Sequence, residues 1–405
     1  MWSAENQGNF LARIAIRRNQ VASMEGNVED LESFQRKISE RFSDLLPASQ
    51  KDHRHQQQPP CSDSAATETA AGETFLSIGW LRKLLDDFLC CETEFKVVLL
   101  VDHDPSHFGK PPLDKLLPEF ADRAIKALDI CNAITDGVEE IQNLQKQAEI
   151  AVSALEQKPL IDGQISRATK ALASLLTSDV VDETEAKARK STEHSRSLAT
   201  RCGRTTAAND LLRGNFRSLS WSVSKKWSAA KQIQAILSNL YPPRAGESTV
   251  LARTIYIMSV VLAFVMWVLV AAIPCQDRTG LGAHTPVPKQ FGWANTMFAV
   301  QEKIAEDWKR KERRGSAGLM EEVAVMEKSA QSLMKALDGF RFPMDEEREE
   351  EIAALVVEVA EGCRRMEEGL GPLQRQIREV FHRIVKSRAE LLDMLEDAKS
   401  SLQEV

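Results

Sequence analysis

Apolar residues recur every three or four positions over most of this chain, and this spacing places them on one side of an α-helix. The stripe is clear between Leu31 and Leu45, and Pro47 then ends the helix. The alternation of apolar and polar positions that marks half-buried strands is nearly absent. The pattern therefore predicts an all-α protein, an elongated multi-helix bundle with disordered linkers.

Polar segments interrupt the helical patterns and divide the chain into seven parts. In order, these are an N-terminal segment with an amphipathic helix (1–47), a disordered linker rich in Gln, Pro, Ser and Thr (48–74), the first part of the bundle (75–177), a polar linker (178–215), a basic segment with two Trp residues (216–241), a strongly apolar segment (254–273) and a C-terminal helical region (295–400). Within the helical parts, we expect a bend near Gly137 and a kink or split at residues 369–372, because Gly and Pro weaken helix interiors.

The apolar segment begins at Thr254, ends at Ile273 and contains no charged residue, no Gly and no Pro. Twenty helical residues span about 30 Å, which is the thickness of a bilayer's hydrocarbon core. Tyr256 would suit a membrane interface, Phe264 and the deeper Trp267 would lie in the bilayer interior, and insertion would be favoured by several kcal/mol. The pattern favours a single-pass transmembrane helix. The alternative is a core helix of a soluble bundle, apolar on every side because other helices surround it.

The charges flanking this segment do not settle its orientation. Arg244 and Arg253 on one side balance Arg278 and Lys289 on the other, although basic residues further upstream favour a cytosolic N-terminal half. That orientation would place the charged C-terminal helices across the membrane, away from intracellular partners. We expect a protein associated with a membrane, single-pass or peripheral, that faces the cytosol; a cytosolic protein is the alternative.

A basic segment with aromatic residues precedes the apolar one. Trp221, Lys225, Lys226 and Trp227 are candidates for lipid contact, because Lys and Trp together suit the surface of an anionic membrane. Ser220, three residues after an Arg, is a candidate phosphorylation site whose phosphate would weaken that attraction. The alternative is a helix whose apolar stripe packs in the bundle.

The remaining composition offers little chemistry. The net charge is −7, so nothing requires a nucleic-acid partner, and the seven Cys residues show no spacing of a zinc or redox site. Cys90 and Cys91 are adjacent in an apolar helix, where packing is favoured over reaction. No motif indicates catalysis, a cofactor, a metal or a small-molecule substrate, so we expect a protein that is not an enzyme. The remaining alternative is an enzyme whose site assembles from residues far apart in the sequence.

Several blocks of sequence, in one order along nearly the whole chain, resemble the plant Bypass/ROH family. The blocks are residues 8–11 (GNFL), 16–20 (IRRNQ), 80–85 (WLRKLL), 126–132 (KALDICN), 216–224 (FRSLSWSVS), 271–276 (AAIPCQ), 365–370 (RMEEGL) and 376–385 (QIREVFHRIV). The resemblance implies a plant protein without catalysis. ROH-type members, to which the blocks are closer, imply binding to an Exo-type subunit of the exocyst, the complex that tethers secretory vesicles. Bypass members imply instead a regulator of a mobile developmental signal without stable exocyst contact.

Overall fold

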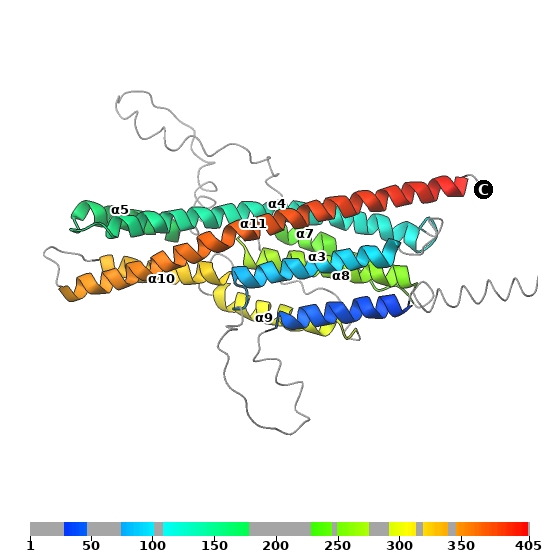
Figure 1. Ribbon diagram of the computed structural model, residues 1–405, viewed down its shortest axis with the longest axis horizontal. Coiled ribbons are helices and arrows are strands. Elements are labelled where there is room, and N and C mark those ends of the chain that lie inside the picture. Colours follow the sequence, from blue (N-terminus) through cyan, green and yellow to red (C-terminus); the bar gives the residue numbers. More distant parts are fainter. Residues whose placement is uncertain are drawn as a thin grey trace, which may run out of the picture.

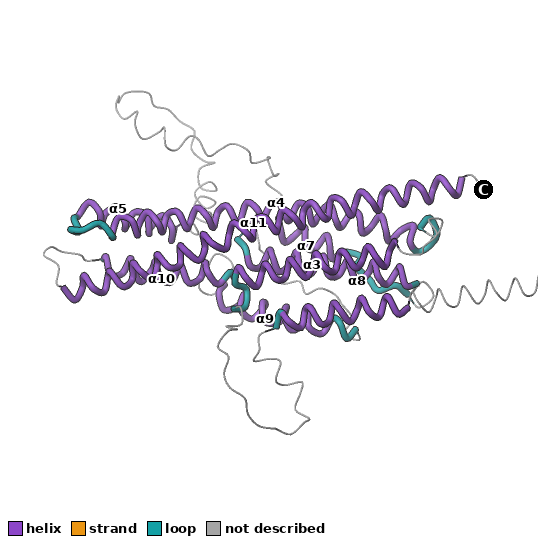
Figure 2. The backbone as a smooth tube through the Cα atoms, viewed as in Figure 1, coloured by secondary structure: helices purple, strands orange, loops and turns teal. Residues whose placement is uncertain are grey.

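The computed structural model describes residues 28–46, 74–100, 108–177, 228–244, 249–274, 291–312, 319–338 and 346–403. Every regular element within these ranges is a helix (Figure 2), which confirms the predicted all-α class. The linkers expected at 48–74 and 178–215 lie outside the described residues, except for residue 74.

The helices lie side by side in an elongated bundle (Figure 1). Along the chain they are a first helix over residues 28–44, α3 (Ile78–Leu100), α4 (Leu113–Leu155), α5 (Asp162–Thr177), α7 (Ala229–Leu237), α8 (Val250–Ala272), α9 (Ala294–Glu312), α10 (Glu321–Leu337) and α11 (Glu346–Gln403). The two longest helices, α4 and α11, pack along each other and form the frame against which the shorter helices lie.

Helix α8 occupies the centre of the part of the bundle formed by α3, α4, α7 and α9, all of which contact it. Every residue from 254 to 273 is buried. The neighbouring helices are amphipathic, with their apolar stripes turned inward. The core is therefore organised around one helix that has no polar face of its own.

Two helices continue through the Gly and Pro residues at which a bend or a kink was expected. Of the kink or split expected at residues 369–372, the split does not occur, because helix α11 runs without a break through Pro372. Leu370 and Leu373 are buried on either side of the proline and hold both halves against the core, which offsets the lost backbone hydrogen bond. Helix α4 also continues through Gly137, and this glycine instead permits a close approach of α8.

Candidate functional site

The site residues predicted from the sequence fall into two groups. The five positions of the apolar segment (Thr254, Tyr256, Phe264, Trp267 and Ile273) belong to α8 or its C-terminal cap, and all are buried. The segment from Ser220 to Trp227, with the candidate phosphorylation site and the candidate lipid contacts, lies outside the described residues.

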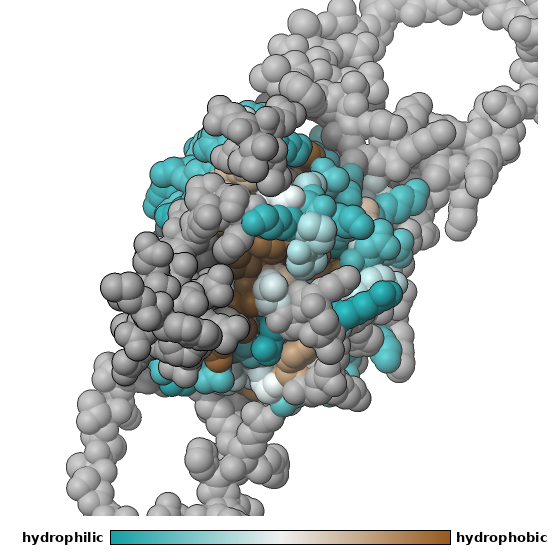
Figure 3. Space-filling view, turned by 90° about the vertical axis from the view of Figure 1, so that its right-hand side faces the viewer, coloured by the Kyte–Doolittle hydropathy of each residue, from teal (hydrophilic) through white to brown (hydrophobic). Residues whose placement is uncertain are grey.

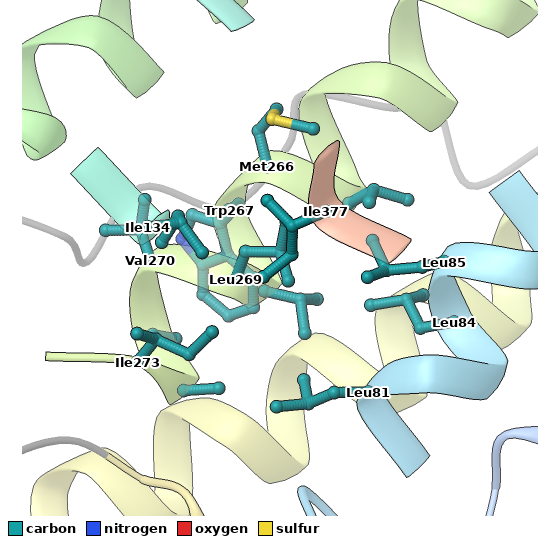
Figure 4. Packing of buried hydrophobic residues seen from close by; sticks show 14 of the residues in the cluster. Leu81, Leu84, Leu85, Ile134, Met266, Trp267, Leu269, Val270, Ile273 and Ile377 are labelled. Carbon is teal, nitrogen blue, oxygen red and sulfur yellow. The ribbon is translucent and has the colours of Figure 1, made fainter. Parts of the chain in front are cut away.

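Side chains from several helices close around the middle of α8. The ring of Phe264 packs edge-on against Phe42 of the first helix, with 5.3 Å between the ring centroids. Cys131 of α4 lies 3.9 Å from the sulfur of Met266. Figure 4 shows leucines of α3 and Ile377 of α11 meeting Trp267 and its neighbours. The apolar helix thus has the environment of a core helix, the second of the two alternatives that its sequence allows.

The hydroxyl groups of Thr254 and Ser259 are satisfied within α8 itself. Thr254 donates from Oγ1 to the carbonyl oxygen of Val250 at 2.9 Å, and Ser259 donates from Oγ to that of Ile255 at 2.8 Å. These bonds leave no hydroxyl of either residue that needs water or a partner helix. This explains why the sequence of α8 suits both a protein core and a bilayer.

The C-terminal end of α8 is fixed by two other parts of the chain. The amides of Leu319 and Met320, just before α10, both donate to the carbonyl oxygen of Ala272, at 3.1 and 3.0 Å. Gly137 of α4 lies so close that a Cβ atom there would overlap the carbonyl oxygen of Pro274. This end of α8 therefore satisfies its last carbonyl through tertiary contacts rather than through water.

Helix α7 connects the undescribed basic segment to this core. Its N-cap, Ser228, accepts a hydrogen bond from the amide of Lys231. At its other end, the buried guanidinium of Arg123 donates to the carbonyl oxygens of Ile236 at 3.2 Å and Asn239 at 3.3 Å. A cation at a helix C-terminus is favourable because the last carbonyls carry partial negative charge. The C-terminal end of α7 is thus held against α4.

A pocket of about 170 Å³ opens beside the first turns of α8. It is lined by Gln35, Pro242, Pro243, Arg253, Tyr256, Ile257 and Phe291. The hydroxyl of Tyr256 is buried and has no hydrogen-bond partner among the residues that the structure describes. Burial raises the pKa of Tyr256 to about 12, so it stays a neutral donor at physiological pH. Among the described residues, its lining includes no nucleophile and no acid–base pair.

The sequence identified Tyr256 but not its partners in this pocket. Gln35, the two prolines and Phe291 lie far from α8 in the sequence, and only folding brings them together. One local signal was available: Arg253 and Tyr256 are three residues apart, so they share a helix face at the start of an otherwise apolar run.

The other polar clusters in the described part of the chain serve structure. Arg41 of the first helix makes a two-pronged ion pair with Glu94 of α3, at 2.8 and 2.7 Å. Cys91 is buried beside Arg41, and burial raises its pKa to about 12, which removes the thiolate that a nucleophile needs. Its neighbour Cys90 is exposed. No group of three or more possible metal ligands occurs among the described residues.

Comparison with known proteins gives a consistent result. The family model described as "Protein ROH1-like" matches residues 1–395. Protein ROH1A of Arabidopsis thaliana is 50% identical over 410 residues, which cover 97% of this chain and 97% of that protein. Protein ROH1D of the same plant is 40% identical over 375 residues, covering 90% of this chain and 88% of that protein. No solved structure matches.

Proposed function

Because the chain belongs to the ROH1-like family, we propose that it is a non-catalytic helical adaptor that binds a subunit of the exocyst at the cytosolic surface of a membrane. The family membership itself confirms the resemblance seen in the sequence. The names of the family and of both relatives describe no enzymatic activity. Support for the exocyst as partner comes from the resemblance to ROH-type proteins.

The observation that carries the proposal is the complete burial of α8. By length and composition, this helix could cross a membrane. Moving it into lipid would expose the inner faces of the surrounding helices, including Leu81, Leu84, Leu85, Ile134 and Ile377. At about 1.5–3 kcal/mol for each side chain, exposing these five to water would cost roughly 8–15 kcal/mol. Insertion would return only several kcal/mol, so the balance favours α8 as the core of a peripheral protein.

Such a bundle is well suited to present surfaces rather than to transform a substrate. Two ion pairs join α3 to α11: the buried Glu92 contacts Arg383 at 3.1 Å, and Lys96 contacts Glu390 at 2.8 Å. Glu92 and Lys96 also contact each other within α3, at 3.2 Å. These contacts fix the register of α3 against α11. A rigid frame with a polar exterior keeps a docking face in one shape, which lowers the entropic cost of binding.

Fractionation and affinity capture from plant cells test the proposal. Full-length tagged protein should sediment with membranes, leave them on a carbonate wash, and recover exocyst subunits from the soluble fraction. A known integral protein and a known peripheral protein in the same extract serve as controls. Retention in the carbonate pellet with release by detergent would show that α8 inserts and would overturn the peripheral arrangement. Failure to recover any exocyst subunit would remove the exocyst and leave a regulator of developmental signalling as the alternative.

A further inference from the structure

The face of α3 that packs against the first helix carries an acidic residue near its centre. Trp80 donates from Nε1 to the carbonyl oxygen of Leu45 at 2.8 Å, and Asp87 lies seven residues further along α3. Seven residues make about two turns of an α-helix, so both side chains lie on one face of α3. Four residues beyond Asp87, the buried Cys91 accepts from the guanidinium of Arg41 at 3.8 Å. Asp87 therefore lies between two points at which α3 contacts the first helix.

The carboxyl group of Asp87 is incompletely satisfied in this interface. Its Oδ2 atom is buried and has no hydrogen-bond partner among the residues that the structure describes. The two cations nearby are engaged by other groups. Arg41 donates to both carboxylate oxygens of Glu94, at 2.8 and 2.7 Å, and Lys83 donates to the backbone carbonyl oxygen of Asp44 at 3.2 Å. A buried oxygen without a partner costs more free energy on a charged carboxylate than on a neutral carboxyl group, so the interface is weaker when Asp87 is ionised.

The surroundings of Asp87 place its change of charge close to neutral pH. Burial raises the pKa of Asp87 to about 6, against the opposing effect of Lys83 and Arg41. The carboxylates of Asp44, on the first helix, and of Asp86, on α3, add to the effect of burial. Ionised and neutral forms of Asp87 are therefore both populated within about one pH unit of 6.

Other ionisable groups at this interface keep one charge state in the same range. Burial acts to raise the pKa of Glu94, but hydrogen bonds from two cations of the first helix hold it below its usual value. Burial raises the pKa of Cys91 to about 12, so this thiol stays neutral. Helix α8 has one charged residue, Arg253 in its first turn, and Arg383 of α11 pairs with Glu92 at 3.1 Å. Among these groups, the aspartate is the one whose charge changes near pH 6.

The first helix is attached in a way that permits it to move as a unit. Its outer positions are mostly polar, like most of the described surface seen from the end of the bundle at which α8 begins (Figure 3). Residues 47–73 connect it to α3, and this length of chain far exceeds the short distance between Leu45 and Trp80. The connection therefore allows the helix to leave α3 while α3 stays folded. Because Phe42 packs edge-on against Phe264 of α8, each separation would uncover one side of the core helix.

We propose that Asp87 makes the first helix a pH-sensitive clamp on α3 and α8. The neutral carboxyl group lets the helix lie firmly against α3, and ionisation weakens this contact, so that the helix separates more often. An acid whose pKa is raised in the docked state stabilises that state at low pH, and the contribution is lost as the pH rises through about 6. With the ordinary pKa of 3.8 in the separated state, docking should be about tenfold more favourable at about pH 5 than at about pH 7.5. The clamp is independent of the proposed membrane and exocyst contacts.

Hydrogen exchange of the full-length protein, followed by mass spectrometry, measures this separation. Protection factors, which are corrected for the intrinsic pH dependence of exchange, are compared at about pH 5 and about pH 7.5. In the wild type, the amides of residues 33–44 should be about tenfold better protected at the lower pH, and the increase should begin as the pH falls through about 6. Asp87→Asn, which has the shape of the neutral acid, should be equally well protected at both values. Asp393→Asn, which removes the same charge from an exposed position of α11, is the matched control and should keep the wild-type response.

Three results would overturn the proposal. Protection of residues 33–44 that does not change with pH in the wild type would mean that the contact does not depend on the charge of Asp87. A tenfold response that persists in Asp87→Asn would assign the pH dependence to another group. An equal change in the amides of α4 and α10 would show that the first helix separates only when the whole bundle unfolds. Asp87→Ala, which removes the carboxyl group altogether, should also abolish the response, and it provides the same comparison if Asp87→Asn does not fold.

Discussion

Replacing Gly137 by alanine tests whether the C-terminal end of α8 truly packs against α4. In an ordinary helix interior this change stabilises a protein by up to about 1 kcal/mol, because alanine has the higher helix propensity. At Gly137 the added methyl group would overlap the carbonyl oxygen of Pro274 and lie 2.8 Å from Cγ2 of Ile273. The first of these atoms belongs to the backbone and cannot rotate away. Gly137→Ala should therefore destabilise the protein instead of stabilising it.

The expected magnitude follows from the movement that the methyl group requires. Helix α4 and the end of α8 must separate by roughly 1 Å, and overpacking of this kind typically costs about 1–3 kcal/mol. The movement would also strain the two hydrogen bonds that Ala272 accepts from Leu319 and Met320. We therefore expect the free energy of unfolding to fall by about 1–3 kcal/mol.

Urea denaturation followed by circular dichroism measures this change, with Gly163→Ala as the matched control. Gly163 is also helical, but a Cβ atom there would meet nothing within 4 Å. The control should be neutral or more stable than the wild type by up to about 1 kcal/mol. If both variants gained stability, α8 would not lie against α4 in solution, and the case for a buried core helix would fail with it.

Four further changes test other parts of the structure. Phe264→Ala should lower stability by about 3–5 kcal/mol in a denaturant titration, because the ring is fully buried, whereas a lipid-facing ring would leave the soluble domain unaffected. Glu92→Gln should cost about 1–3 kcal/mol, because its ion pairs with Lys96 of α3 and Arg383 of α11 would become weaker hydrogen bonds, and high salt should not mimic this loss. Burial raises the pKa of Asp87 from 3.8 to about 6. Protonated Asp87 therefore stabilises the folded state at low pH, and this contribution is lost as the pH rises through about 6. In Asp87→Asn, the thermal midpoint should vary less with pH between about 4 and 6 than in the wild type. Arg123→Gln should increase amide hydrogen exchange in α7 more than elsewhere, because the carbonyl groups at the end of α7 would lose the cation that they bind. An equal increase in exchange across the whole bundle would contradict this role.

Much of the fold could be predicted from local sequence. The spacing of apolar residues identified the first helix and most of the later ones, because an amphipathic helix records its buried face in its own sequence. Boundaries were set by Pro47 and similar residues. The helix does not split at Pro372, since packing on both sides of a proline can outweigh one lost hydrogen bond. That packing comes from distant residues such as Ile78, which lies against Gly369.

The candidate site could be predicted only in part. Tyr256 was identified, because an aromatic residue at the start of an apolar run is a local signal. Its place in a pocket was not, since Gln35 and Phe291 reach that pocket from segments more than thirty residues away on either side. A pocket made by side chains from separate helices leaves no period in the sequence. The same holds for Arg123, whose function depends on carbonyl groups of α7.

The two alternatives for the apolar segment show why hydropathy alone could not decide between them. Hydropathy measures only the preference of α8 to leave water, and a bilayer and a protein core satisfy that preference equally well. The difference lies in other helices: the inner faces of α3 and α4 gain burial only if α8 stays between them. Those faces carry their own apolar stripes, which would need another cover if α8 were in lipid. The environment of the most apolar helix is thus determined by the amphipathic helices around it.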